Sequence, residues 1–217
     1  MSSSDPTRRR SGAPGGQKGI ARRGADTPRR IGDRKGSARR GADTRRRIEA
    51  AAGRLFTIHG YTATTMQAIA TEAGVHVQTI YLAYGTKPTL LAASAARLVA
   101  GDEDPATHPG ERRWAREVAA EPDPRAKLAR YVKQIGDVSP RITPLIDVLR
   151  ATAPAEPDVA AFLAEMEQGR REGPRQLLGL GVPAGTWRPD LTPDKVADIV
   201  FAIASPDTLR ALIDRCG

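Results

Sequence analysis

The chain has 217 residues, of which 40% are hydrophobic and 27% charged, a composition typical of a globular protein with one large or two small domains. No apolar run approaches the roughly 18 residues that a membrane span requires, so a transmembrane role is excluded. A single cysteine, Cys216, excludes an internal disulfide, and the three histidines form no ligand-spaced cluster. We therefore expect no metal, no cofactor and a reducing, cytoplasmic location.

The net charge of +9 is concentrated at the amino terminus. Residues 1–47 hold 15 of the 34 Lys and Arg residues against four Asp, a net charge of +11, whereas the remainder of the chain sums to −2. A basic segment attached to a near-neutral body points to a polyanionic partner.

Residues 1–43 form a basic arm that has almost no apolar side chains and many Gly, Ser and Pro residues, so we expect it to be disordered. The heptapeptide Ala-Arg-Arg-Gly-Ala-Asp-Thr occurs in it from residue 21 and again from residue 38, where it runs into the first helix. Two copies are typical of a local duplication. The arm lacks the apolar core of a secretory signal. Two interpretations are open: the arm binds the polyanion, or it results from a wrongly assigned start site and has no function.

From Thr44 onward the hydrophobic pattern is helical throughout, and no strand pattern competes with it, so we predict an all-α fold. The first helix carries a stripe at three- and four-residue spacing and ends at Gly60: Ile48, Ala52, Leu55, Phe56 and His59. For the second helix we predict Thr64 as the N-cap, with Gln67 closing a capping box. Its expected buried stripe is Met66, Ile69, Ala70 and Ala73, and Gly74 ends it.

A third short helix is predicted over Val77 to Tyr84. Ile80 and Tyr84 fall on its inner side, and the opposite arc carries Gln78, Thr79 and Leu82. Gly85 ends it, and Thr86 caps a longer helix. A helix, a Gly-containing turn and a second short helix with a polar outer arc are the layout of a helix-turn-helix DNA reader.

Four motifs follow one another at fixed spacings through this region: Gly60–Ala70, Ala73–Val75, Thr79–Tyr81, and Lys87 with Leu90 and Leu91. Together they resemble the DNA-binding domain of the TetR family of bacterial transcriptional regulators. The resemblance implies a helix-turn-helix domain over residues 44–90, followed by an all-helical ligand-binding and dimerisation domain over residues 91–217.

Carried over position by position, the resemblance implies contacts with double-stranded DNA. Thr65 and Gln67 would approach it from the start of the second helix, although Gln67 has the capping box as an alternative role. Lys87 would hold a phosphate. We expect four residues to enter the major groove: His76, Val77, Gln78 and Thr79. Tyr81 would touch the DNA backbone or a thymine methyl. Independently of the resemblance, the basic arm lies directly before the first helix, so its arginines, together with Arg45 and Arg46 just after it, can follow the DNA backbone or enter the adjacent minor groove.

The sequence departs from the family at two of these positions. His76 stands where the family often has a Ser or Thr cap, and Ala83 stands where a polar or aromatic contact residue is common.

Residues 91–217 contain further helical stripes, separated by cap-and-proline helix starts. These starts are Asp123-Pro124, Ser139-Pro140, Glu156-Pro157, Thr192-Pro193 and Ser205-Pro206, and a loop is expected over 181–190. The resemblance implies a pocket for a small-molecule inducer between the middle helices. The residues that could line it are Trp114, Tyr131, Ile135, Leu149 and Phe162. Ordinary core packing is the alternative role of each. Relatives of this kind usually continue past a position like Gly217 with another helix, so we expect a shortened dimer interface.

The function that fits these patterns is a ligand-responsive repressor that acts as a homodimer on a palindromic operator. The alternative is a non-specific architectural DNA-binding protein driven by the basic arm, which would not need the polar arc of the third helix. An enzyme is not expected, because the sequence has no Gly-rich phosphate loop, no His-Glu-x-x-His and no Gly-x-Ser-x-Gly.

Overall fold

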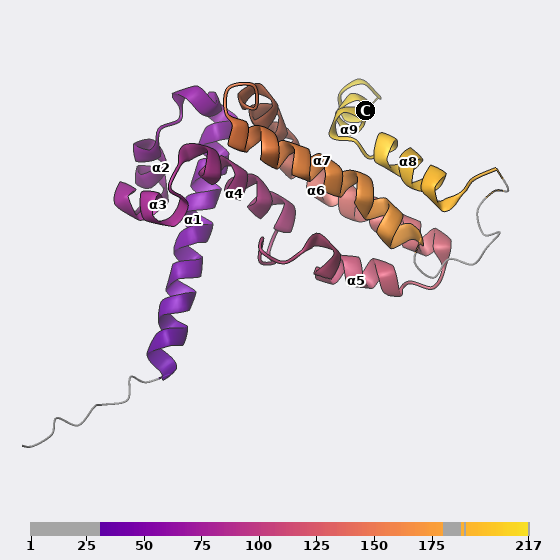
Figure 1. Cartoon of the computed structure of the whole chain (residues 1–217), viewed down its shortest axis with the longest axis horizontal. Coiled ribbons are helices and arrows are strands. Elements are labelled where there is room, and N and C mark those ends of the chain that lie inside the picture. Colours follow the sequence, from indigo (N-terminus) through magenta and orange to yellow (C-terminus); the bar gives the residue numbers. More distant parts are fainter. Residues whose placement is uncertain (1–30, 180–187, 189, 217) are drawn as a thin grey trace, which may run out of the picture.

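The computed structural model describes residues 31–179, 188 and 190–216, and within these ranges it contains helices and no strand, which confirms the predicted all-α fold. The predicted loop over 181–190 lies almost wholly outside the described residues. The helices, shown in Figure 1, are α1 Ile31–Ala63, α2 Met66–Ala73, α3 Val77–Tyr84, α4 Lys87–Ala100, the 3-10 helix Pro109–Glu111, α5 Arg113–Ala120, α6 Pro124–Thr152, α7 Pro157–Gly179, α8 Pro193–Ile203 and α9 Pro206–Cys216.

Helix α1 begins at Ile31, which corrects the expectation that the arm is disordered as far as residue 43. No proline lies between Pro28 and Pro88, and extending an existing helix costs far less than nucleating a new one. The stable helix after Thr44 therefore propagates toward the amino terminus. At its other end, Gly60 has φ 75° and ψ 174°, so the predicted break at this glycine is confirmed.

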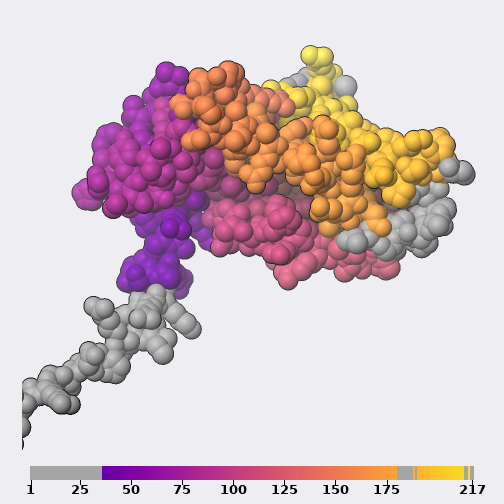
Figure 2. Space-filling view, in the orientation of Figure 1, coloured from indigo at the N-terminus to yellow at the C-terminus, as the bar shows by residue number. Residues whose placement is uncertain are grey.

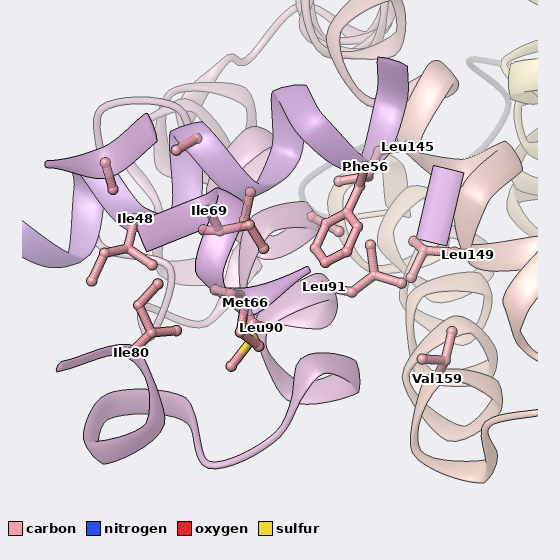
Figure 3. Packing of buried hydrophobic residues seen from close by; sticks show 14 of the residues in the cluster. Ile48, Phe56, Met66, Ile69, Ile80, Leu90, Leu91, Leu145, Leu149 and Val159 are labelled. Atoms are coloured by element: carbon pink, nitrogen blue, oxygen red, sulfur yellow. The ribbon is translucent and has the colours of Figure 1, made fainter. Parts of the chain in front are cut away.

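Helices α1 to α4 pack around a first cluster of buried apolar side chains that extends into α6 and α7 (Figure 3). The predicted stripe of α2 is buried as expected, and α3 has the predicted bounds. The expected domain boundary between residues 90 and 91 falls inside α4, where Leu90 and Leu91 both belong to this cluster. The first cluster consists of Ile48, Ala51, Ala52, Phe56, Met66, Ile69, Ala70, Ala73, Ile80, Leu90, Leu91, Ala95, Ile142, Leu145, Ile146, Leu149 and Val159.

Helix α6 is continuous through Pro140, so the predicted helix start at Ser139-Pro140 is wrong. Burial outweighs the lost hydrogen bond here, because the residues after the proline, among them Ile142 and Leu145, lie in the first cluster. Side chains add bonds to nearby carbonyls: the Thr143 hydroxyl donates to the Ser139 carbonyl at 2.7 Å. The starts predicted at Asp123, Glu156, Thr192 and Ser205 are confirmed.

A second cluster joins α5, α6, α7 and α8 at the opposite end of α6. Its buried members are Ala115, Val118, Tyr131, Leu177, Leu178, Val196 and Val200. Helix α9 is held on α6 by two ion pairs, Arg150 with Asp207 at 2.8 Å and Arg210 with Asp147 at 2.7 Å. Helix α6 thus connects the two clusters, and the molecule is elongated along it (Figure 1).

Candidate nucleic-acid interface

The outer face of α3 is exposed to solvent, whereas its inner face packs on the first cluster. Ile80 is fully buried in the first cluster, whereas Gln78, Tyr81 and Leu82 are exposed, Leu82 to 81%. The turn before α3 is made at Gly74, whose φ of 63° is in the left-handed region that favours glycine. The predicted inner side is therefore confirmed for Ile80 and the predicted outer side for Gln78 and Leu82, whereas Thr79 and Tyr84 are half-buried.

A polar network anchors the carboxyl end of α3. The Tyr84 hydroxyl donates to Glu49 Oε1 at 3.0 Å, and Arg97 Nε donates to Glu49 Oε2 at 2.9 Å. Arg97 also donates to the carbonyl of Glu103, in the connection between α4 and α5, at 2.8 Å. Burial, and then the Glu49 carboxylate, raise the pKa of Tyr84 above its usual range, so it remains a donor.

Sequence reasoning missed Glu49 and Arg97. Their side chains are only 8% and 18% exposed. Glu49 stands three and seven residues before Ala52 and Phe56, on the buried stripe of α1, and this spacing is the signal that an acidic residue faces the interior.

The N-cap of α2 is Thr65, so the predicted capping box of Thr64 and Gln67 is wrong. The Thr65 hydroxyl accepts from the Ala68 amide at 3.0 Å. Thr64 is buried instead, and its hydroxyl lies 2.8 Å from the Gly60 carbonyl and 3.1 Å from that of Leu55. Gln67 is exposed on α2. Since it does not close a capping box, the DNA contact that the resemblance implies is the role that still stands as a prediction.

The other residues predicted at the start of α3 divide by exposure. His76 is exposed and precedes the helix without a side-chain cap bond. Val77 is half-buried and packs against the first cluster, and Thr79 is half-buried. Among the α3 residues predicted to contact DNA, Gln78 and Tyr81 are thus the most accessible polar side chains.

Lys87 lies in a groove between α1 and the α6–α7 corner. Its Nζ atom is 4.1 Å from the centre of the Tyr61 ring, and the Tyr61 hydroxyl donates to Glu156 Oε1 at 2.9 Å. Burial lowers the pKa of Lys87, an effect that the Glu156 carboxylate opposes. The groove has a volume of about 740 Å³ and is also lined by Asp147 and Thr152.

The arginines predicted to contact DNA from α1 are exposed. Arg46 reaches toward the α4–α5 connection, with Nη2 3.5 Å from the Asp102 carbonyl. The backbone carbonyl of Arg45 is 3.5 Å from the Tyr84 hydroxyl, so this part of α1 lies beside the end of α3.

The five predicted pocket walls do not share one site. Trp114, Tyr131 and Ile135 belong to the second cluster, where the rings of Trp114 and Tyr131 are 6.3 Å apart. Burial raises the pKa of Tyr131 to about 12. Leu149 and Phe162 belong instead to the first cluster or pack against it.

Residues 48–94 match the bacterial regulatory proteins of the tetR family. The amino-terminal domain of this chain is therefore similar to that of TetR-family regulators. The match begins in the buried stripe of α1, includes all of α2 and α3, and ends within α4, so it covers the helix-turn-helix derived above. The resemblance predicted from the four motifs is thereby confirmed.

Solved structures of regulatory proteins share the fold of the larger part of the chain. A TetR transcription regulator from Haloarcula marismortui has a TM-score of 0.60 and 21% identity over 79% of this chain and 87% of that one. The fatty acid degradation regulator FadR from Bacillus halodurans gives 0.58 and 19% over 78% and 88%. NalD, the secondary repressor of the MexAB-OprM multidrug efflux pump in Pseudomonas aeruginosa, gives 0.51 and 19% over 80% and 86%.

No curated protein matches the chain. Within the described residues, no helix is both long and apolar enough to cross a membrane. Nor do the described His, Cys, Asp and Glu residues form a group of three or more that could hold a metal ion.

Proposed function

We propose that this protein is a sequence-specific transcriptional regulator whose α3 reads operator DNA in the major groove. The observation that carries the proposal is the exposed outer face of α3, on a helix fixed at its centre by Ile80 and at its end by Tyr84. A base-reading helix needs both features, because hydrogen bonds to base edges require side chains that are accessible and held in register.

Gln78 is the main base reader in this proposal. Its amide matches adenine N6 and N7, and its exposure leaves it accessible to a base edge. Thr65 and Gln67 approach the backbone from the amino end of α2, and Tyr81 contacts the backbone or a thymine methyl. Lys87 contributes a phosphate contact after its ammonium leaves the Tyr61 ring.

We further propose a homodimer on a palindromic operator, in which α8 and α9 form the contact between subunits. Helix α8 buries Val196 and Val200 in the second cluster, yet leaves Ile199 and Ile203 exposed four residues apart on another face. Leu212 on α9 is exposed as well. Two apolar faces on adjacent helices are an interaction surface, and a two-fold dimer would place two copies of α3 in successive major grooves.

A small-molecule inducer and a repressor role complete the proposal. NalD is a repressor by its printed name, and the fold similarity to it supports the same sense of regulation. The second cluster is the place we propose for ligand entry: there Trp114 of α5 lies beside Tyr131 of α6, and Ile135 of α6 packs against the same cluster. We also propose a cytoplasmic location, because a regulator of this kind would act on chromosomal DNA.

The test is a selection of bound duplexes from a randomised pool, followed by binding to the selected duplex and to a scrambled duplex of equal length. Gln78→Ala should weaken binding to the selected duplex by about 1–3 kcal/mol and change binding to the scrambled one little. Lys87→Ala should weaken binding to both duplexes, because a phosphate carries no sequence information.

Gln176→Ala serves as the matched control, since Gln176 is exposed on α7, far along the chain from the interface. It should leave both affinities unchanged. A pool from which no sequence is enriched would support the alternative, a non-specific architectural binder driven by the basic arm.

A further inference from the structure

The amino-terminal part of α1 projects from the body of the protein as a separate stem (Figures 1 and 2). We define this basic stem as residues 31–47, since Ile48 is the first side chain of α1 in the first cluster. At 1.5 Å per residue the stem is about 24 Å long. Its described side chains, from residue 36 onward, are exposed or half-exposed.

The composition of the stem does not suit packing against another protein surface. It contains seven Lys and Arg residues against two Asp and, beyond Ile31, no large apolar side chain. A helix that is polar on every side gains nothing from burial. Its chemistry is that of a surface for a polyanion.

The root of the stem lies against the helix-turn-helix. The Arg47 guanidinium lies beside the α2–α3 turn, with Nη1 3.8 Å from the position that a Cβ atom on Gly74 would take. The Arg45 carbonyl lies 3.5 Å from the Tyr84 hydroxyl at the end of α3. The stem is therefore continuous with the surface that presents α3.

Helical geometry separates the arginines of the stem into two faces. Arg40 stands seven residues before Arg47, about 20° away around the axis, so both follow the side of the α2–α3 turn. Arg39 stands seven residues before Arg46, which reaches toward the Asp102 carbonyl on the side of the α4–α5 connection. Among the ion pairs between described residues, none engages Arg39, Arg40 or Arg47.

We infer that the basic stem is a preformed helix that binds the phosphate backbone of DNA beside the half-site read by α3, through the face of Arg40 and Arg47. This inference rests on the proposed function and adds a second contact region to it. The partner is duplex DNA because the stem continues the surface that presents α3, and its guanidinium groups can each bind a backbone phosphate. The stem adds affinity without sequence preference, since phosphates are the same beside every site.

The first test compares neighbouring arginines on the two faces of the full-length protein. Arg40→Ala should weaken binding to both the selected and the scrambled duplex, and should lower the slope of log affinity against log salt by about 0.9, the value for one phosphate. Arg39→Ala is the matched control, with the same charge change one residue away, and should lower the slope by less than half as much. Equal slopes for Arg40→Ala and the parent protein would overturn the inference, as would equal losses in the two variants.

The second test changes the helix and keeps every charge. A Cβ atom at Gly41 would meet nothing within 4 Å, so Gly41→Ala should stabilise the stem and tighten binding to both duplexes about two- to fivefold. Ala42→Pro should break the stem and weaken binding to both. Parental affinity in both variants would show that a flexible arm suffices and would overturn the inference.

The outcomes separate the inference from the proposed function. If the pool yields no enriched sequence, the proposed function fails. If a sequence is enriched and read through Gln78, while the stem variants bind like the parent protein, only the inference fails. Circular dichroism and thermal unfolding verify that the body is intact, because Arg39, Arg40, Gly41 and Ala42 all precede the first core residue of α1.

Discussion

The two buried clusters differ in how completely they exclude solvent. In the first cluster the large side chains Phe56, Ile80 and Leu149 are fully buried, and α3 stands directly on it. In the second cluster only Ala115 is fully buried, while Tyr131 and Val200 retain some exposure. The part of the molecule that must present a fixed surface is thus built on the more complete core.

The difference extends to the surfaces over the two clusters. Above the first cluster, exposed apolar side chains such as Leu82 lie on the face that we propose to enter DNA. Beside the second cluster, Ile199 and Ile203 lie on the face that we propose to meet a second subunit. A core that is completed by a partner can remain less complete in the single chain.

The largest expected effect comes from matched leucine truncations in the two clusters. Leu149→Ala should lower the free energy of unfolding by about 3–5 kcal/mol, because the fully enclosed site cannot collapse around the cavity. Leu178→Ala should lower it by about 2–3 kcal/mol, since its neighbours in the second cluster are only partly enclosed. Chemical denaturation at one fixed protein concentration measures both values. A larger loss for Leu178→Ala would reverse the ranking of the two cores.

The second prediction concerns the network that joins α3 to α1 and α4. Glu49→Gln should lower the free energy of unfolding by about 2–3 kcal/mol, because it leaves the largely buried Arg97 without its carboxylate. Tyr84→Phe should cost less, about 1 kcal/mol, since it removes one hydrogen bond of the same carboxylate.

Both network variants should also weaken operator binding at temperatures where they remain folded, because the end of α3 loses its anchor. A double-mutant cycle of Glu49→Gln with Arg97→Met isolates the pair. A coupling energy near zero would show that Glu49 acts through packing alone.

The third prediction concerns the uncovered face of α8. Ile203→Asp should weaken subunit association by about 1–2 kcal/mol per subunit, because a charge replaces an apolar side chain in the proposed interface. Analytical ultracentrifugation across a dilution series measures the shift from dimer to monomer. Lys195→Asp is the control, because it introduces the same side chain at an exposed position of the same helix. It should leave the association nearly unchanged. Identical dilution curves for Ile203→Asp and the parent protein would exclude this face.

Local patterns predicted much of the fold. The buried stripe of α2, the bounds of α3, and the caps Thr86, Asp123 and Thr192 depend on residues within one or two turns of each other. Periodicity and capping chemistry act over that range, so the sequence contains the whole signal.

Features that depend on distant residues could not be predicted in this way. Thr64 and Thr65 are equivalent as caps in the sequence, and only the carbonyls of Leu55 and Gly60 decide which one turns inward. Helix α6 passes Pro140 because its next turns are buried. At the candidate interface, the Glu49–Arg97 pair joins residues 48 positions apart. The anchor of α3 could therefore not be predicted from the sequence, although the outer arc of α3 could.

The smallest expected effect concerns the attachment of α9 to α6. Asp207 accepts two hydrogen bonds from the Arg150 guanidinium, at 2.8 and 3.0 Å, and this interaction holds the pKa of Asp207 below its ordinary value of 3.8. A carboxyl group whose pKa is lower in the folded state stabilises the protein above its unfolded pKa, and this contribution is lost as the pH falls through the folded pKa. The pair therefore contributes fully above about pH 5, and its contribution is fully lost only below the folded pKa of Asp207. Because both side chains are largely exposed, Asp207→Asn should cost only about 0.2–1 kcal/mol at pH 7. The difference in unfolding free energy between Asp207→Asn and the parent protein should shrink as the pH is lowered from 5 toward 3, and a difference that is constant over this range would show that the ion pair does not stabilise α9.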